Sequence, residues 1–346
     1  MESKVEYLDI TDFIKKSKGI LTLDVRAPKE FKKGHIPSAT SFPLFDDIER
    51  AEVGTAYKKQ SKEKAIELGL DIVGKKMGDF ARTLKTLTQD KKVFVYCWRG
   101  GMRSGSLAWL INLLGYEVFV LKGGYKSYRN FVLEGLGKPF TLSMLSGQTG
   151  SGKTQILQAL QSQGEQVIDL EAIAHHKGSA FGGLGLPAQP SPEQFENNLY
   201  EALSVLDTTK NCWIEDESKA IGTCYLPEPF WLQMKQAPLY NITVPLEKRI
   251  AHLVDQYGQY SVESLTACVK NLEKRLGTEA AKLAIEKLAE NNLRDVAILL
   301  LHYYDKAYSF GTTKKVNVLK KNLFFETQSD SEIAKALIHS SKQNIL

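Results

Sequence analysis

The chain has 346 residues, of which 43% are hydrophobic and 25% charged, and this length and composition suit two globular domains with cores of their own. A formal net charge of +5 permits an RNA partner without requiring one. No apolar run is as long as a membrane span and no signal peptide stands at the N-terminus, so we expect a cytoplasmic protein with no membrane partner.

The four cysteines are scattered along the chain, at positions 97, 212, 224 and 268. No two of them have CxxC spacing, which argues against a disulfide framework and against a zinc site. We therefore expect free thiols and no tightly bound cofactor.

The first part of the chain alternates strand and helix patterns. Apolar strands are predicted at 19–26, 92–97 and 116–121. Residues 104–114 have apolar side chains at helical spacing, and the charged segment 46–90 is mainly helical, with breaks expected at Gly69, Gly74 and Gly78. This order of strands and helices predicts a parallel α/β sheet.

Cys97 stands directly after a predicted strand and before a predicted helix. Backbone N–H groups in such a loop form an anion-binding nest at the helix N-terminus, which lowers the pKa of a thiol and favours the nucleophilic thiolate. A lone cysteine after an apolar strand is more commonly structural, but the glycine pair and two arginines here favour a reactive one. The expected anion-binding residues of this cysteine loop are Arg99, Gly100, Gly101, Arg103 and Ser104.

Three motifs occur together in this part: LDVR at 23–26, EFKKGHIPSA at 30–39, and CWRGGMRS at 97–104. With them, residues 8–135 resemble the rhodanese family of sulfurtransferases. The resemblance implies that Cys97 is a nucleophile that carries a transferable sulfur or selenium atom. The C-x5-R spacing from Cys97 to Arg103 is longer than in the usual sulfurtransferase loop and is like that of rhodanese-related phosphatases, so the loop could accept a tetrahedral phosphate-type anion. His35 lies in a turn and is more often structural than catalytic.

A second glycine-rich loop, GQTGSGKT at 147–154, lies between a predicted strand (140–145) and a predicted helix (154–163). This P-loop would cradle a diphosphate with its backbone N–H groups, neutralise it with its lysine and hold Mg²⁺ with its threonine. The expected diphosphate-binding residues are Gly147, Gly150, Gly152, Lys153 and Thr154.

Acidic residues that would assist a metal ion or a substrate follow the next two predicted strands, at 166–169 and 212–216. Asp169 with Glu171 and Asp216 with Glu217 are alternative sets, and either set would also be ordinary for solvated loops. The metal is unknown. Arg249 and Arg275 are candidates for phosphate contacts, although surface charges on helices explain each of them better.

The segment 171–183 combines histidines, a lysine, glycines and an aromatic residue, and we interpret it as a substrate-binding loop, with a linker as the alternative. A metal site that uses both His175 and His176 is not expected, since adjacent side chains point in different directions. Further strands and helices are predicted at 240–244, 262–309 and 331–340.

The cysteine loop, the P-loop and the segment 170–182 together resemble the tRNA 2-selenouridine synthase family over essentially the whole chain. The resemblance implies a transferase that replaces the sulfur of 2-thiouridine at tRNA wobble position 34 with selenium from selenophosphate. It also implies an S-geranylated intermediate made from geranyl diphosphate. The cysteine loop would bind selenophosphate, and the P-loop would bind either geranyl diphosphate or a nucleotide.

Two other functions stay open: a rhodanese-like phosphatase or sulfurtransferase with an ATP-binding regulatory domain, and a nucleotide-dependent RNA-binding protein in which Cys97 is inert. Aromatic and basic residues would meet the anticodon loop of a tRNA. These residues are Tyr125, Lys126, Tyr128, Arg129, Lys314, Lys315, Lys320 and Lys321.

The predicted fold class is α/β throughout, with a rhodanese-like parallel-sheet domain at 1–135. A P-loop NTPase-like α/β domain with a helical C-terminal part is expected at 136–310, followed by a basic C-terminal extension at 311–346.

Overall fold

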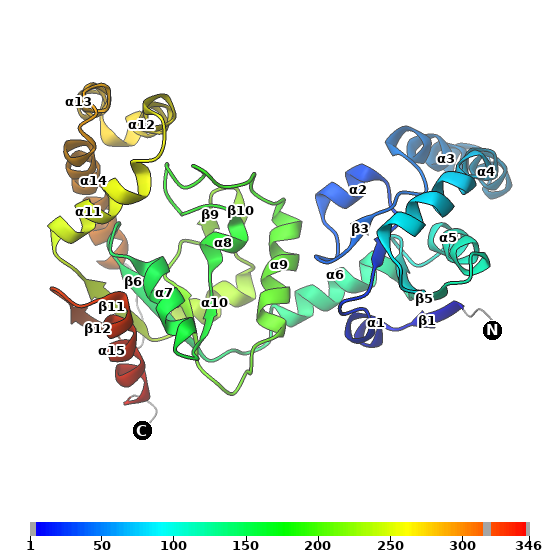
Figure 1. The fold of residues 1–346 in the computed structure, drawn as a ribbon, viewed down its shortest axis with the longest axis horizontal. Helices are drawn as coiled ribbons and strands as arrows, with labels where there is room; N and C mark the ends of the chain where they lie inside the picture. The colour runs from blue at the N-terminus through cyan, green and yellow to red at the C-terminus, as the bar shows by residue number, and fades with distance from the viewer. Residues whose placement is uncertain (1–4, 314–319, 344–346) are drawn as a thin grey trace. The chain divides into compact units, whose positions relative to one another are not determined.

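A computed structural model describes residues 5–313 and 320–343, with the side chains of 309–313 left out. Two compact units make up the chain. Unit 1 comprises Met1–Gly135 with Glu196–Asn198, and unit 2 comprises Leu136–Phe195 with Leu199–Leu346. Each unit has its own sheet (Figure 1), and each is described by itself below.

Unit 1 contains a five-stranded sheet in the order β1-β5-β4-β2-β3, in which every pairing is parallel. Its strands are β1 (Val5–Leu8), β2 (Thr22–Asp24), β3 (Thr40–Ser41), β4 (Lys92–Tyr96) and β5 (Glu117–Leu121). Its helices are α1 (Ile10–Lys16), α2 (Pro28–Lys33), α3 (Asp47–Lys59), α4 (Lys62–Leu87), α5 (Met102–Leu113) and α6 (Gly124–Gly135). The central strands β4 and β5 are almost wholly buried, which explains their continuous apolar sequences.

Helix α4 runs without interruption through Gly69, Gly74 and Gly78, so the predicted breaks are wrong. A glycine inside a helix costs only about 1 kcal/mol relative to alanine, and the long apolar face of α4 packs on the core of unit 1. At Gly69 the helix packs close to the Phe45 ring, which would lie 3.4 Å from a Cβ on this residue, an ordinary contact distance.

Unit 2 contains a second parallel sheet, in the order β12-β11-β6-β8-β7, and a small antiparallel ribbon of β9 and β10. Its strands are β6 (Leu142–Gly147), β7 (Gln166–Ile168), β8 (Cys212–Glu215), β9 (Ala220–Ile221), β10 (Cys224–Tyr225), β11 (Leu239–Thr243) and β12 (Lys320–Phe324). Its helices begin with α7 (Lys153–Ser162), α8 (Leu170–Ala174), α9 (Pro192–Ser204), α10 (Glu228–Gln236) and α11 (Leu246–Tyr257). They continue with α12 (Val262–Leu276), α13 (Thr278–Ala289), α14 (Leu293–Thr313) and α15 (Asp330–Lys342). The predicted fold class is therefore confirmed.

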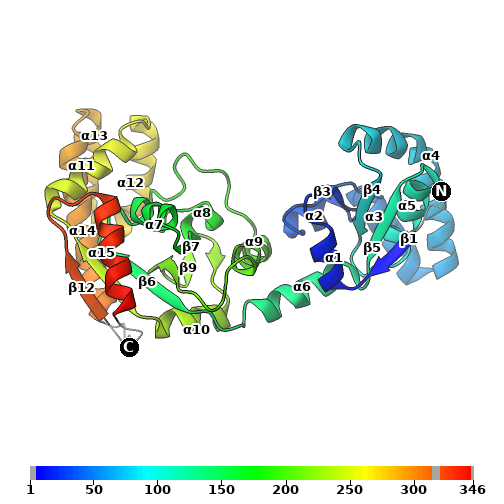
Figure 2. The ribbon, with the colours of Figure 1, turned by 60° about the horizontal axis from the view of Figure 1, so that its bottom comes forward.

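The C-terminal segment, predicted as a basic extension, supplies an edge strand and a helix to unit 2. Strand β12 pairs in parallel with β11, and α15 lies beside α7 in both ribbon views (Figures 1 and 2). Ile333, Ala334 and Leu337 of α15 are at most 1% exposed. The sequence does not predict this strand, because its lysines are typical of a solvated tail. Lysines also protect sheet edges from unwanted pairing.

In the described ranges, no helix has both the length and the apolar character that crossing a membrane requires.

If α15 is part of the core of unit 2, Leu337→Ala should lower the free energy of unfolding by about 3 kcal/mol, because it leaves a cavity under a fully buried side chain. Urea titration of the full chain measures this change. Lys335→Ala, on the exposed face of the same helix, is the control and should change stability by less than about 0.5 kcal/mol. Equal effects of the two substitutions would contradict the packing.

Candidate functional site

The cysteine loop joins β4 to α5, and the first turn of α6 donates backbone hydrogen bonds to it. The N–H of Tyr125 donates to the carbonyl oxygen of Cys97 at 2.8 Å, and the N–H of Lys126 donates to that of Trp98 at 3.0 Å. Gly124 has a φ of +59°, and a Cβ on it would lie 2.3 Å from the Cys97 carbonyl oxygen. Only glycine allows this approach, so Gly124 shapes the loop although its sequence position marked no more than the end of a strand.

The curvature within the loop depends on one glycine of the predicted pair. Gly100 has a φ of +66°, and a Cβ on it would lie 2.6 Å from the Leu121 carbonyl oxygen. Gly101, the N-cap of α5, has a φ of −100° and open space around its missing side chain. Other residues could adopt that conformation, so the curvature of the loop does not require a glycine at position 101.

The thiol of Cys97 is buried, at 3% exposure, beside the N-terminus of α5. Its Sγ lies 3.2 Å from the Ser104 hydroxyl, and that hydroxyl donates to the Gly101 carbonyl oxygen at 3.1 Å. The Ser104 oxygen is therefore free to accept a hydrogen bond from the thiol. The Cys97 sulfur and the N-terminus of α5 therefore border the same loop.

The two arginines of the loop have different surroundings. Arg99 is exposed, whereas Arg103 donates to the Glu30 carboxylate at 2.7 Å. Partial burial alone would raise the pKa of Glu30, but the hydrogen bond and charge of Arg103 hold that pKa below its ordinary value. The ionised carboxylate of Glu30, on α2, therefore neutralises Arg103. The LDVR and EFKKGHIPSA motifs could not reveal this pairing by spacing alone.

A buried ion pair of Arg26 and Asp24 packs against the start of α6, the helix that contacts the cysteine loop. Arg26 and Asp24 are 1% and 0% exposed, with the Arg26 Nη2 2.5 Å from Asp24 Oδ2. The same guanidinium donates to the Gly34 carbonyl oxygen at 2.6 Å and lies over the Tyr125 ring, 3.8 Å from its centroid. Because this tyrosine lies in the first turn of α6, the ion pair supports the helix turn that contacts the cysteine loop. His35 stacks on Phe31 at 3.8 Å and has the structural position expected for it.

Arg26→Met should destabilise unit 1 by about 3 kcal/mol, because it leaves the Asp24 carboxylate buried without its partner. Chemical denaturation of the full chain, followed by near-UV circular dichroism, measures the loss. Arg82→Met removes an arginine from an exposed pair with Asp79 and should cost less than about 0.5 kcal/mol. A loss of stability that is the same for both would contradict a supporting role for the buried pair.

The P-loop has the geometry expected of a phosphate cradle. Gly150 and Gly152 each have a φ of +80°, and α7 begins at Lys153, so the N–H groups of the loop converge at a helix N-terminus. The Lys153 ammonium donates to the Gly147 carbonyl oxygen at 2.9 Å. Gly150 also permits close packing, since a Cβ there would lie 3.0 Å from the Arg249 carbonyl oxygen.

Arg249 is 3% exposed and supports the P-loop from α11, so its interpretation as a surface charge is wrong. Its Nε donates to the Thr149 carbonyl oxygen at 2.8 Å, and its Nη2 pairs with Asp305 at 2.6 Å. These hydrogen bonds are made to the backbone of the loop and to Asp305, so they do not leave the guanidinium directed at a phosphate. A helical arginine opposite a loop distant in sequence cannot be identified from periodicity. Arg275 is exposed on α12, as expected of a surface charge.

Two carboxyls, Glu171 and Glu217, meet beside the lysine of the P-loop. Burial, followed by the neighbouring Glu217 carboxyl, raises the pKa of Glu171 to about 8, and Lys153 opposes this rise. Burial also raises the pKa of Glu217, again against Lys153. The pair therefore holds a proton near neutral pH. Asp169 caps α8 through a 2.7 Å bond from the Ala172 N–H, and Asp216 accepts from Ser146 at 2.6 Å.

Of the two alternative acidic sets, Glu171 of the first and both Asp216 and Glu217 of the second line the P-loop site, whereas Asp169 does not. Within residues 5–313 and 320–343, no group of three or more His, Cys, Asp and Glu side chains is arranged to hold a metal ion. His175 ends α8 in the left-handed conformation, with a φ of 51°, and His176 packs against Gly182. Neither is placed with the other in a common site.

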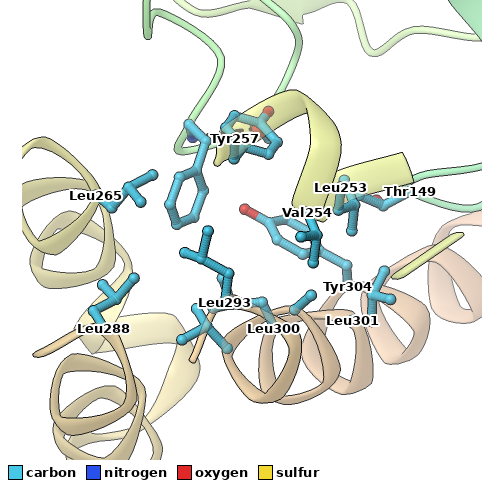
Figure 3. A pocket seen from close by; sticks show the side chains of 14 residues that line it. Thr149, Leu253, Val254, Tyr257, Leu265, Leu288, Leu293, Leu300, Leu301 and Tyr304 are labelled. Carbon is cyan, nitrogen blue, oxygen red and sulfur yellow. Dashed lines mark hydrogen bonds between the residues drawn. The ribbon is translucent and has the colours of Figure 1, made fainter. Parts of the chain in front are cut away.

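Two neighbouring cavities lie at the P-loop. The first, of about 220 Å³, is polar and is lined by the loop, Glu171, Glu217 and Lys177 among others. The second, of about 60 Å³, is lined almost wholly by aliphatic and aromatic side chains of α11–α14 (Figure 3). We call them the P-loop cavity and the apolar cavity. Five residues line both: Thr149, Ser179, Leu253, Tyr257 and Tyr304.

The shared residues connect segments that the sequence analysis treated separately. Ser179 and Lys177 come from the segment interpreted as a substrate-binding loop, and that segment does line the P-loop cavity. Leu253 with Tyr257, and Tyr304 with Tyr308, each stand four residues apart on one helix face. That spacing was a signal for a shared face, but it could not show which cavity the face lines.

The residues predicted to contact RNA are mostly not free to do so. Tyr125 and Tyr128 are at most 2% exposed, and Arg129 has a 13% exposed side chain. The prediction that these tyrosines stack on RNA bases is therefore wrong. Lys126 and Lys320 are exposed, whereas Lys321 donates to the Ser340 carbonyl oxygen at 2.9 Å. Lys314 and Lys315 lie outside the described residues.

Inorganic pyrophosphate should bind the P-loop more weakly as the pH rises through about 8, because Glu171 then loses its proton beside Glu217 and repels the anion. The other charged groups facing Glu171 are Lys153 and Asp169. In Glu171→Gln most of this pH dependence should disappear. Calorimetric titration without added metal measures the affinity across this pH range.

Glu279→Gln, on an exposed position of α13, is the control for that titration and should keep the dependence of the unsubstituted chain. If Glu171→Gln retains the same pH dependence, the loss of affinity comes from the ligand or from another group.

Comparisons with known proteins agree in both units. Residues 140–269 match the family model of the tRNA 2-selenouridine synthase AAA domain, and residues 10–131 match that of the rhodanese-like domain. The chain is 33% identical over 329 residues to tRNA 2-selenouridine synthase of Shewanella denitrificans, covering 85% of this chain and 88% of that protein. It is 35% identical to the one of Aeromonas salmonicida, covering 85% and 87%. A solved N-terminal domain of a putative ATP/GTP binding protein from Clostridium difficile is 40% identical, with a TM-score of 0.34, over 37% of this chain and 99% of that one.

Proposed function

Because this chain belongs to the tRNA 2-selenouridine synthase family, we propose that it converts 2-thiouridine at the tRNA wobble position to 2-selenouridine by two consecutive transfers, one at each anion-binding loop. Its family membership makes it an enzyme of tRNA selenouridine modification. In the first proposed transfer, the P-loop site attaches a geranyl group to the sulfur. In the second, selenium from selenophosphate replaces the geranylated sulfur at the cysteine loop.

The observation that carries the proposal is the shared wall of the P-loop cavity and the apolar cavity. A P-loop by itself suits any diphosphate, including that of a nucleotide. A nucleotide would place a ribose and a base beyond its phosphates, and both need polar partners. Here the space beyond the P-loop is lined by Leu253, Val254, Leu300 and other apolar side chains. Such a cavity favours a hydrocarbon chain, and therefore a prenyl diphosphate over ATP.

The first transfer needs a stabilised leaving group. The sulfur of 2-thiouridine attacks the first carbon of the geranyl group, the carbon–oxygen bond breaks, and diphosphate leaves with the electron pair while the base loses its N3 proton. Lys153 and the N–H groups of the P-loop are placed to stabilise the charge that develops on the diphosphate. Thr154 would hold a Mg²⁺ ion, which would add positive charge at the same oxygens.

The second transfer needs a tetrahedral anion beside a thiol. Selenophosphate would occupy the nest at the N-terminus of α5, where Cys97 and Ser104 meet. Selenium forms a bond to C2 of the base, the geranylated sulfur leaves with the electrons of the carbon–sulfur bond, and water then takes the phosphoryl group and releases phosphate. Alkylation in the first transfer makes this sulfur a better leaving group. Cys97 would be the nucleophile that attacks phosphorus and frees the selenium as selenide, and it would hold the phosphoryl group until water takes it. Arg103 can turn from Glu30 to the anion.

Lys153→Ala and Cys97→Ala should separate the two transfers. Lys153→Ala should reduce geranylation at least about a hundredfold, as loss of a charge-stabilising group does, while selenation of RNA that is already geranylated survives. Cys97→Ala should show the reverse pattern. Mass analysis of nucleosides from a 2-thiouridine anticodon stem-loop, with selenophosphate and geranyl diphosphate omitted in turn, measures both steps.

Lys138→Ala and Cys224→Ala are the matched controls and should retain both transfers, because neither residue lines a loop or cavity described above. Equal loss of both steps in Lys153→Ala would mean that the P-loop serves a shared step or the fold, which contradicts the division of labour.

The C-x5-R spacing of the cysteine loop supports one second candidate, a phosphatase of the rhodanese-related kind. Its Cys97 would attack phosphorus and Arg103 would bind the phosphate oxygens. Efficient turnover of a phosphotyrosine analogue that is lost in Cys97→Ala would favour this function over selenium transfer.

A further inference from the structure

The apolar cavity has an open end and a closed end. Thr149 and Leu253 lie at the end next to the P-loop, whereas Leu265 and Leu288 lie at the opposite end, with Leu293 to the right of Leu288 (Figure 3). Leu265 and Leu288 are 3% and 1% exposed. A chain that enters from the P-loop therefore meets a closed wall of buried leucines.

We propose that this wall, formed by Leu265 of α12, Leu288 of α13 and Val296 of α14, determines which length of isoprenoid chain the P-loop site accepts. The inference rests on the proposed function, because it assumes that the P-loop ligand is a prenyl diphosphate. It adds the residues that make the site selective among donors, which the P-loop motif cannot do.

The wall is fixed by packing on its far side. Leu265, Leu288 and Val296 belong to one buried cluster that also contains Val269, Leu272 and Ala284. Protein interiors are close-packed, so a wall residue cannot retreat without displacing a neighbouring helix. A donor whose chain extends past this wall therefore clashes with it, whereas a shorter chain does not reach it.

The open end has a polar group that would orient the head of the chain. The Tyr304 hydroxyl is buried, and its polar neighbours are the Ser179 side chain and the Ala180 backbone. In Figure 3 it points into the cavity between Tyr257 and Val254. A hydroxyl at this position can donate to the oxygen that joins the diphosphate to the prenyl chain. The head of the donor is then held at the boundary between the two cavities. The distance from this boundary to the wall therefore limits the length of the chain.

Donor competition tests the proposal. The full chain and a 2-thiouridine anticodon stem-loop are incubated with dimethylallyl, geranyl or farnesyl diphosphate, and mass analysis gives kcat/KM for each S-prenylated nucleoside. The unsubstituted chain should prefer the geranyl donor. Leu288→Ala should raise the ratio of farnesyl to geranyl transfer about tenfold or more, and Val296→Phe should shift the preference about as far toward dimethylallyl.

Leu272→Ala is the matched control, because Leu272 is buried in the same cluster but does not line the cavity. It should lower stability without changing the donor ratios. Should Leu288→Ala fail to fold, Leu265→Val removes less volume from the same wall and should move the ratio in the same direction.

Unchanged donor ratios in folded wall variants, with geranyl transfer intact, would overturn the inference and leave the proposed function standing. Absence of transfer from every prenyl diphosphate by the unsubstituted chain would overturn the proposed function, and the inference with it.

Discussion

Both candidate sites depend on one constraint of parallel sheets, namely that neighbouring strands end at the same edge. Cys97 follows β4, and the P-loop begins where β6 ends, so each loop passes from a buried central strand directly into the N-terminus of a helix. Backbone N–H groups are left without helical partners at that point, and they attract anions before any side chain contributes. The same geometry therefore appears in two units that have different sequences and different chemistry.

Each unit also limits the positive charge of its own anion site. In unit 1, Glu30 neutralises Arg103, and in unit 2, Lys153 lies near the Glu171–Glu217 pair. A cationic group that already has a partner binds an anion only when the new interaction exceeds the old one. This arrangement discriminates against weakly charged anions and favours ligands with several negative oxygens. Glu30 and Glu217 come from segments distant in sequence, α2 and the segment after β8, whereas Glu171 lies on α8, the next helix after α7.

The division of unit 2 into a polar and an apolar part gives a physical reason for its helical region. A parallel sheet with a P-loop needs no bundle beyond α11 to bind a diphosphate. The helices α12–α14 bury a core of their own and leave a cavity against the loop. Tyr257 and Tyr304 border both cavities, and burial raises the pKa of each phenol, so the boundary stays uncharged. A prenyl diphosphate has the same division into a charged head and an apolar chain.

The sequence alone located the central strands of both sheets, the two anion-binding loops and the family, because strand, loop and helix are local patterns and both motifs are contiguous. It did not predict the edge strands β1 and β3 or the ribbon of β9 and β10. It failed where a contact joins distant segments. Arg249 behind the P-loop, Gly124 beneath Cys97, the wall of Leu265 and Leu288, and the burial of Tyr125 all depend on which helices meet. The same holds for β12, whose lysines are ordinary for a tail and equally ordinary for a protected edge. Periodicity gives each helix a buried face, but only tertiary packing decides what that face meets.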